Sequence, residues 1–256
     1  RRDASIDRVR SDAGYAAGNL VMMSARAQVA KAANGFEGAR AIARRLESDL
    51  GRGHGAAVLQ DDLNAIHWGR IAVLCSFVEP LPHAQACELP MLVLPPNRLR
   101  LFNPVQALQA FISQQLLSAG WSQRINAFEA LLSGQPLRRA FRSFFQTLLP
   151  RVLEAGRSAD PQRVRWAVED AWRHAPVMQR WVRFALLLTP AKCESLLSRA
   201  AVQHLVPAGM RFEPLADADA TEGWCLASRG YVPHGLQRQP STRALAGSAR
   251  CPQSSH

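Results

Sequence analysis

Arginine is the residue type whose abundance points most directly to chemistry in this sequence. The 256 residues include 31 lysines and arginines against 20 aspartates and glutamates, and Lys31 and Lys192 are the only lysines. A guanidinium makes planar, two-pronged contacts with phosphate, so the formal net charge of +11 favours a polyanionic partner such as DNA or RNA. A GC-rich coding sequence also produces abundant arginine, alanine and glycine, and composition alone leaves both explanations open.

Histidine and cysteine are the other residue types that could form a chemical site. His83 and Cys87 are close in sequence, but Pro80 and Pro82 interrupt the helix that they would share, which weakens the case for a metal site. The five cysteines include no CxxC pair, which argues against a disulfide framework and favours a reducing cytoplasm. The sequence contains no GxSxG, no phosphate-binding lysine loop and no HExxH.

Short patterned segments at the amino end predict a compact ββα element. Residues 5–9 alternate in polarity and predict a strand, residues 11–18 have the composition of a loop, and residues 20–23 predict a second strand. Ser24 can cap a helix that runs to Lys31.

Helical periodicity and capping residues account for most of the remaining chain. No uninterrupted apolar run reaches the roughly 18 residues of a membrane helix. The proline-rich segment 78–104 cannot be one helix, and its MLVL stretch predicts a short strand or a buried connector. The helices predicted elsewhere span residues 35–49, 56–78 (as one helix or two), 103–117, 122–132, 137–152 and 190–204. Two more helices are predicted between Asp160, which caps the first of them, and residue 190, and Pro176 separates the two.

Four anchors follow one another in the amino-terminal element: SIDRV at 5–9, GY at 14–15, GN at 18–19 and SARAQVAK at 24–31. They resemble the carboxyl half of an HNH-type endonuclease domain, in the variant that runs S-[LI]-D-R-[IV]-D, then G-Y-x-x-G-N-[LV], then a helix bearing R-A-N-x-x-K. The resemblance predicts that the other half of the motif precedes this sequence in a longer protein. It carries no information about residues 50–256.

This resemblance implies cleavage of DNA phosphodiester bonds with one divalent cation, Mg²⁺ or Mn²⁺. It makes Asp7 and Gln28 the metal ligands, Asn19 the residue that pins the loop between the strands, and Lys31 a contact to phosphate. The catalytic set is then Asp7, Asn19 and Lys31. The residues expected against nucleic acid are Arg8, Arg26 and Lys31.

Three positions depart from the family pattern. Arg8 stands where the standard motif has its general-base histidine, and a guanidinium does not lose its proton at neutral pH. Gln28 is one methylene longer than the usual asparagine, and Arg10 replaces an aspartate. A polar turn between two strands could also use Asp7 and Asn19 only to hold itself together.

The sequence therefore predicts a mainly α protein in three parts: a partial HNH-like ββα element with its following helix over 1–50, a helical domain of unassigned family over 56–236, and a disordered tail over 237–256. Between residues 138 and 203, twelve basic and five acidic side chains give a net charge of +7. The expected function is metal-dependent DNA cleavage in the cytoplasm. The alternative is a non-catalytic, basic, helical protein that binds nucleic acid or another protein.

Overall fold

The computed structural model describes residues 3–13, 15, 17–52, 59–95, 99, 101–154 and 160–206. In this part of the chain, a two-stranded antiparallel sheet at the amino end is followed by ten α-helices. The predicted mainly α fold with a small ββα element is confirmed. Most of the segment 51–55 between the first two predicted parts and all of the expected tail at 237–256 lie outside the described residues.

The two strands pair along their whole length. β1 (Ala4–Arg8) runs antiparallel to β2 (Leu20–Ser24), with Asp7 opposite Val21. Side chains alternate between the two faces of such a pair, so Val21 reaches the core while its neighbour Met22 is exposed. The pairing places Asp7 on the face that the rest of the protein covers.

Ser24 ends β2 and begins α1 (Ala25–Lys31), as its sequence position predicts. Its hydroxyl accepts a hydrogen bond from the backbone N–H of Ala27 at 3.2 Å, which satisfies one of the free donors of the first turn. The backbone N–H of Ala25 donates to Asp3 O at 2.7 Å. These two bonds fix the direction in which the helix leaves the sheet.

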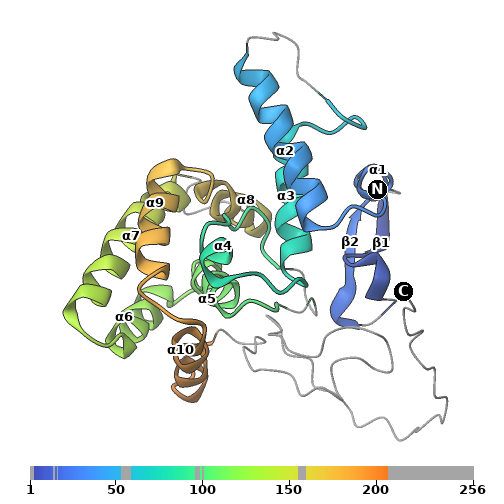
Figure 1. Cartoon of the computed structure of the whole chain (residues 1–256). Helices are drawn as coiled ribbons and strands as arrows, with labels where there is room; N and C mark the ends of the chain where they lie inside the picture. Colours follow the sequence, from blue (N-terminus) through green and yellow to red (C-terminus); the bar gives the residue numbers. More distant parts are fainter. Residues whose placement is uncertain are drawn as a thin grey trace, which may run out of the picture.

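α2 (Phe36–Gly51) and α3 (Ala65–Ser76) pack side by side next to the hairpin (Figure 1). Phe36 and Trp68 are fully buried between these elements. α2 matches the helix predicted over 35–49 closely.

α3 begins later than the sequence predicts. Asp61 and Asp62 adopt positive φ angles of 51° and 60°, which place a turn rather than a helix before it. The Asn64 side chain then accepts a hydrogen bond from His67 N at 3.0 Å and caps the first turn. The part of the predicted 56–78 helix that precedes residue 65 is therefore wrong where the structure describes it, from residue 59 onward.

The proline-rich segment contains one short helix, α4 (His83–Cys87), followed by an extended connector. Residues 91–94 form no strand, so the connector alternative is confirmed. Buried Glu169 accepts a hydrogen bond from Leu94 N at 3.0 Å, and Arg165 donates to Leu94 O at 2.8 Å. Both backbone groups of this connector residue are thus satisfied by one helix from the second half of the chain.

α5 (Pro104–Gln115) is buried on every side, although four of its residues are glutamines. A buried amide must find partners, and three of these glutamines find them in distant parts of the chain. The hydrogen bonds run from Gln106 to Ser76 Oγ at 2.8 Å, from Gln109 to Leu89 O at 3.0 Å and from Gln115 to Leu205 O at 3.1 Å.

Asn103 precedes α5 at the predicted N-cap position, but its side chain does not cap the helix. Instead Oδ1 accepts from Leu81 N at 2.9 Å. Nδ2 lies 3.0 Å from Ser76 O, 2.9 Å from Glu79 O and 2.8 Å from Gln106 Oε1. The side chain therefore joins the end of α3, the following turn and the start of α5.

Five further helices complete the described chain: α6 (Trp121–Leu131), α7 (Gln135–Leu153), α8 (Pro161–Ala171), α9 (Ala175–Ala185) and α10 (Pro190–Val202). Asp160 caps α8 through its side chain, as predicted, and the Thr189 side chain caps α10. An aromatic cluster joins α7, α8 and α9, with ring centroids 5.2 Å apart for Phe144 and Trp181 and 5.3 Å apart for Trp172 and Trp181.

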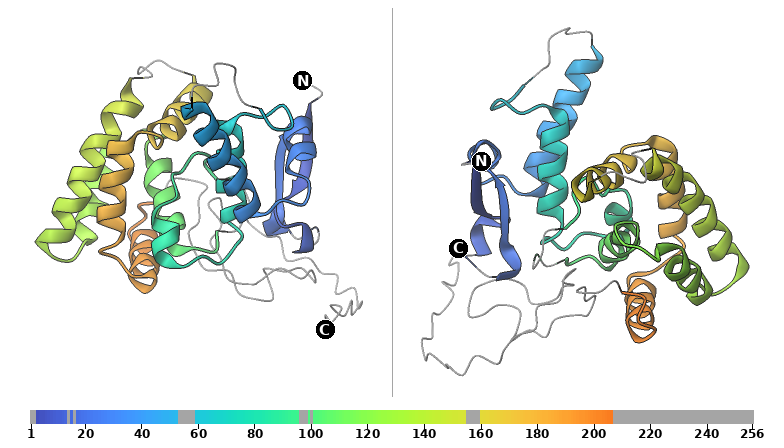
Figure 2. Two further views of the ribbon diagram at one scale, coloured as in Figure 1. Left: turned by 45° about the horizontal axis from the view of Figure 1, so that its top comes forward. Right: turned by 180° about the vertical axis from the view of Figure 1, so that it is seen from behind.

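In space, the hairpin and α1 lie on one side of the described structure and α6 and α7 on the opposite side, with α3, α4 and α5 between them (Figures 1 and 2). One connected set of buried apolar side chains extends from Val9 beside the hairpin to Leu205 after α10. No helix in the described ranges combines the length and apolarity needed to cross a bilayer.

Three cysteines in this core have strongly altered acidity. Burial raises the pKa of Cys75, Cys87 and Cys193 from the ordinary value of 9.0 to about 12. The folded state therefore keeps these protons at pH values where the unfolded chain loses them. We expect the free energy of unfolding to be unaffected by the thiols below pH 9 and to fall as the pH rises from 9 towards 12.

Urea denaturation at a series of alkaline pH values measures this loss. A variant with Cys75, Cys87 and Cys193 all replaced by alanine serves as the control, because it retains every other alkaline titration. The slope of stability against pH should be smaller in the variant than in the native sequence, and equal slopes would refute the role of burial.

Candidate site in the amino-terminal hairpin

Asn19 organises the loop between the two strands. It is fully buried, its Oδ1 accepts from Arg10 N at 2.8 Å, and its Nδ2 donates to Arg10 O at 2.8 Å. Its own carbonyl accepts from Val9 N at 2.8 Å. These bonds extend the ladder past β1 and β2, which is the loop-pinning position that the resemblance assigns to Asn19.

Asp7 and Lys31 form an ion pair between β1 and α1. Lys31 Nζ lies 3.1 Å from Asp7 Oδ2 and donates to Arg8 O at 2.9 Å. The Lys31 side chain is 0% exposed and that of Asp7 is 15% exposed. A lysine is rarely buried so completely unless it is paired, so the aspartate neutralises the ammonium group that α1 places against the strand.

α1 also covers the outer edge of β1. In an antiparallel pair, alternate residues of each strand direct their backbone groups away from the partner strand. Gln28 Nε2 donates to Ile6 O at 3.4 Å, and Lys31 donates to Arg8 O two residues further on. The two helix residues that the resemblance places at a metal and a phosphate thus satisfy successive carbonyls of the strand edge.

The two predicted nucleic-acid contacts outside this pair differ in their surroundings. Arg8 donates to Ser11 O at 2.9 Å and lies 5.0 Å from the centre of the Tyr15 ring, so it stabilises the loop. Arg26 is exposed on α1, and no hydrogen bond or ion pair within the described ranges holds it. The pKa of His67 on α3 is lowered, first by burial and then by the nearby charges of Arg26 and Arg70.

The donor set around Asp7 does not fit the divalent cation that the resemblance implies. Asp7 is a single carboxylate whose charge Lys31 already balances. Gln28 directs its amide nitrogen to the strand. The described part of the chain contains no group of three or more histidine, cysteine, aspartate or glutamate side chains arranged to hold a metal ion. Mg²⁺ and Mn²⁺ prefer several oxygen ligands, and the residues that the resemblance names as metal ligands supply one carboxylate.

The His83 and Cys87 pair and the tryptophans of the second half of the chain lie away from the hairpin. His83 Nε2 donates to Leu188 O at 2.8 Å and lies 3.5 Å from Cys87 Sγ, so this pair joins α4 to the turn after α9. Trp172 and Trp181 are fully buried in the aromatic cluster, whereas Trp166 on α8 is 51% exposed. The two buried tryptophans are core residues.

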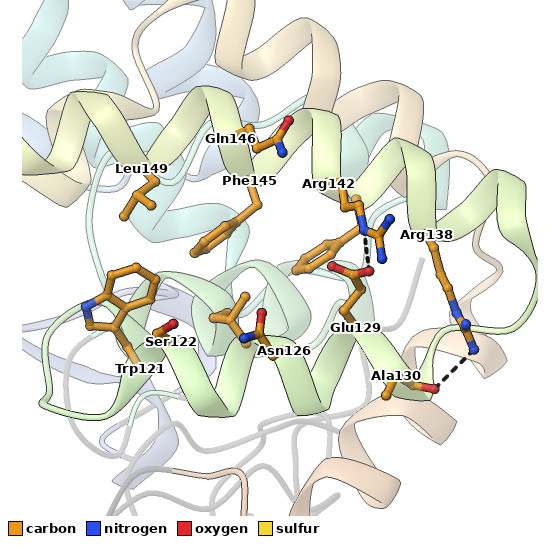
Figure 3. Close-up of a pocket in the computed structure, with 12 residues that line it drawn as sticks. Trp121, Ser122, Asn126, Glu129, Ala130, Arg138, Arg142, Phe145, Gln146 and Leu149 are labelled. Atoms are coloured by element: carbon orange, nitrogen blue, oxygen red, sulfur yellow. Dashed lines mark hydrogen bonds and ion pairs between the residues drawn. The ribbon is translucent and has the colours of Figure 1, made fainter.

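A groove that was not predicted from the sequence lies between α6 and α7 (Figure 3). Its volume is about 600 Å³. Trp121, Phe145 and Leu149 line one part, and Glu129, Arg138 and Arg142 line the other. The apolar stripe of α7 was visible in the sequence, but a stripe does not reveal which of its side chains the neighbouring helix leaves uncovered.

Comparison with protein-family models, with curated proteins and with solved structures gives no match to this chain.

Proposed function

We propose that this protein binds nucleic acid through phosphate contacts, and that its amino-terminal ββα element is a structural unit without its own metal-dependent catalysis. The element keeps the order of strands, loop and helix of the HNH-type half-motif that it resembles. Its Asp7 and Lys31 side chains hold the hairpin and α1 together.

The excess of basic residues supports binding. With 31 basic and 20 acidic side chains, the protein has arginines that its own carboxylates cannot pair. Four of them are exposed and make no hydrogen bond or ion pair within the described ranges: Arg26, Arg44, Arg139 and Arg183. Guanidinium groups that are free in this way can bind phosphates without regard to base sequence.

The ion pair between Asp7 and Lys31 is the observation that carries the non-catalytic part of the proposal. A carboxylate that neutralises a fully buried ammonium group at 3.1 Å is not available as the main ligand of a divalent cation. Removing it to bind a metal would leave Lys31 buried without a counter-charge.

The test is a titration of labelled DNA with the full chain at several salt concentrations. Because each phosphate contact releases counterions, four contacts predict a slope of log K against log salt of about −3 to −4 on duplex DNA. Replacing Arg139 and Arg183 by glutamine should reduce the steepness of the slope by about 2. A slope near zero would contradict the proposal.

Matched controls separate free arginines from paired ones. Arg151 and Arg163 lie near Glu154 and Asp160, at 3.0 Å and 3.4 Å, so their replacement by glutamine should change the slope less. Plasmid nicking with Mg²⁺ is measured in parallel. Nicking that is present in the native protein and lost in a folded, DNA-binding Asp7→Asn variant would overturn the non-catalytic assignment.

A further inference from the structure

The groove between α6 and α7 is divided along its length into an apolar part and a charged part (Figure 3). In the apolar part, the rings of Trp121 and Phe145 lie 6.0 Å apart at an angle of 48°, and Leu149 continues this floor. Trp121 is only partly buried, so aromatic surface is accessible from the groove. Phe141 lies stacked behind Phe145, at 5.9 Å and 22°, and supports its ring.

The charged part is held in place by its own contacts. Arg142 Nε lies 2.5 Å from Glu129 Oε1, while 59% of the Arg142 side chain is exposed. Arg138 Nε donates to Leu132 O at 2.9 Å, and its Nη2 lies 3.5 Å from Ala130 O. The carboxylate is thus balanced by Arg142, and Arg138 leaves the lining with one net positive charge.

We propose that this groove binds single-stranded nucleic acid, with a base against Trp121 and Phe145 and the adjoining phosphate at Arg142 and Arg138. The inference rests on the proposed nucleic-acid binding and adds a site for a single strand to the phosphate contacts of the exposed arginines. A nucleotide joins a flat ring, the base, to an anion, the phosphate, and these two groups match the two parts of the groove. Proteins that bind single strands without sequence preference stack bases on aromatic side chains next to arginines.

The geometry favours a single strand over the other macromolecules that could enter. In a duplex each base is stacked and paired, so its faces cannot reach the ring of Trp121. An amphipathic helix from a protein partner needs a continuous apolar groove, whereas Glu129, Arg138 and Arg142 occupy half of this one.

The first test compares two isosteric charge changes on the same helix. Asn126 lines the groove and Gln123 does not, and both are exposed. At low salt, Asn126→Asp should weaken binding of a fluorescent oligo(dT) several-fold through repulsion of phosphate, while Gln123→Glu should change it less than two-fold. Both variants should melt at the temperature of the native protein, because neither side chain is buried.

The second test concerns stacking. Trp121→Ala should weaken oligo(dT) binding roughly 5- to 100-fold, the range found when a stacking residue is removed. Trp166→Ala is the matched control, because Trp166 is exposed on α8 outside the groove. Ultraviolet cross-linking of oligo(dT) that contains 5-bromouracil should attach to the peptides that carry Trp121 or Phe145.

The outcomes distinguish the two proposals. Two results would refute the groove as the binding site and leave the proposed function intact. One is cross-linking of oligo(dT) to other peptides. The other is a groove variant that binds oligo(dT) as tightly as its control does, while salt-dependent DNA binding persists. If the protein bound duplex DNA and oligo(dT) equally well, and if Asn126→Asp weakened neither, the groove would likewise be refuted and the proposed function would stand. Absence of binding to any nucleic acid removes both proposals together.

Discussion

Lys31→Met should lower the free energy of unfolding by about 3 to 5 kcal/mol, because it leaves Asp7 partly buried without its cation. The substitution also removes the donor to Arg8 O at the edge of β1. Both losses fall on the contact that holds α1 against the hairpin. Urea denaturation followed by circular dichroism measures the change.

The chain supplies its own control for this variant, since Lys192 is the only other lysine and is exposed on α10. Lys192→Met should change stability by less than about 0.5 kcal/mol, as surface substitutions do. The double variant Asp7→Leu/Lys31→Met should recover most of the loss, because an apolar pair can replace a buried ion pair. Equal effects of the two lysine variants would show that the ion pair stabilises nothing.

Asn103→Ala should cost about 2 to 4 kcal/mol, since it leaves several buried polar groups without partners. Leu81 N loses its acceptor, and Glu79 O and Gln106 Oε1 lose a donor. The bonds to Ser76 O and Gln106 Oε1 are buried, so water does not replace the lost donor there. Thermal and urea unfolding should both report the loss.

Asn64→Ala is the matched comparison for Asn103→Ala. Asn64 makes one capping hydrogen bond to His67 N at the start of α3, and removal of such a cap costs about 1 kcal/mol. If the two alanine variants were equally stable, the hydrogen bonds of the Asn103 side chain would contribute no more to the free energy of unfolding than one helix cap does.

Features fixed by neighbouring residues were predictable from the sequence. Ser24, Asp160 and Thr189 cap the helices that they precede, because the capping oxygen reaches a donor only two or three residues away. The strand pair followed in the same way from alternation and from the polar loop at 11–18. Asn103 shows the limit, since its position before α5 was predicted correctly while its side chain bonds elsewhere.

Features that depend on distant partners were not predictable. The glutamines of α5 suggest a partly exposed helix, and only the acceptors at Ser76, Leu89 and Leu205 explain its burial. The connector at 91–94 likewise acquires its conformation from Glu169, which a local pattern cannot reveal.

The hairpin illustrates the same limit at the level of the site. The sequence brings Asp7, Gln28 and Lys31 into one element, and the structure places them together. Spacing does not state whether a carboxylate meets a metal or an ammonium group. The burial of Lys31 beside Asp7 becomes visible only in the folded structure.

The coverage of β1 by α1 restricts how this sheet can grow. An exposed strand edge is a template for a further strand, from the same chain or from another copy. Here the side chains of Gln28 and Lys31 occupy the carbonyls that a third strand would need on that side. Strand addition, whether in assembly or in aggregation, must therefore proceed along β2.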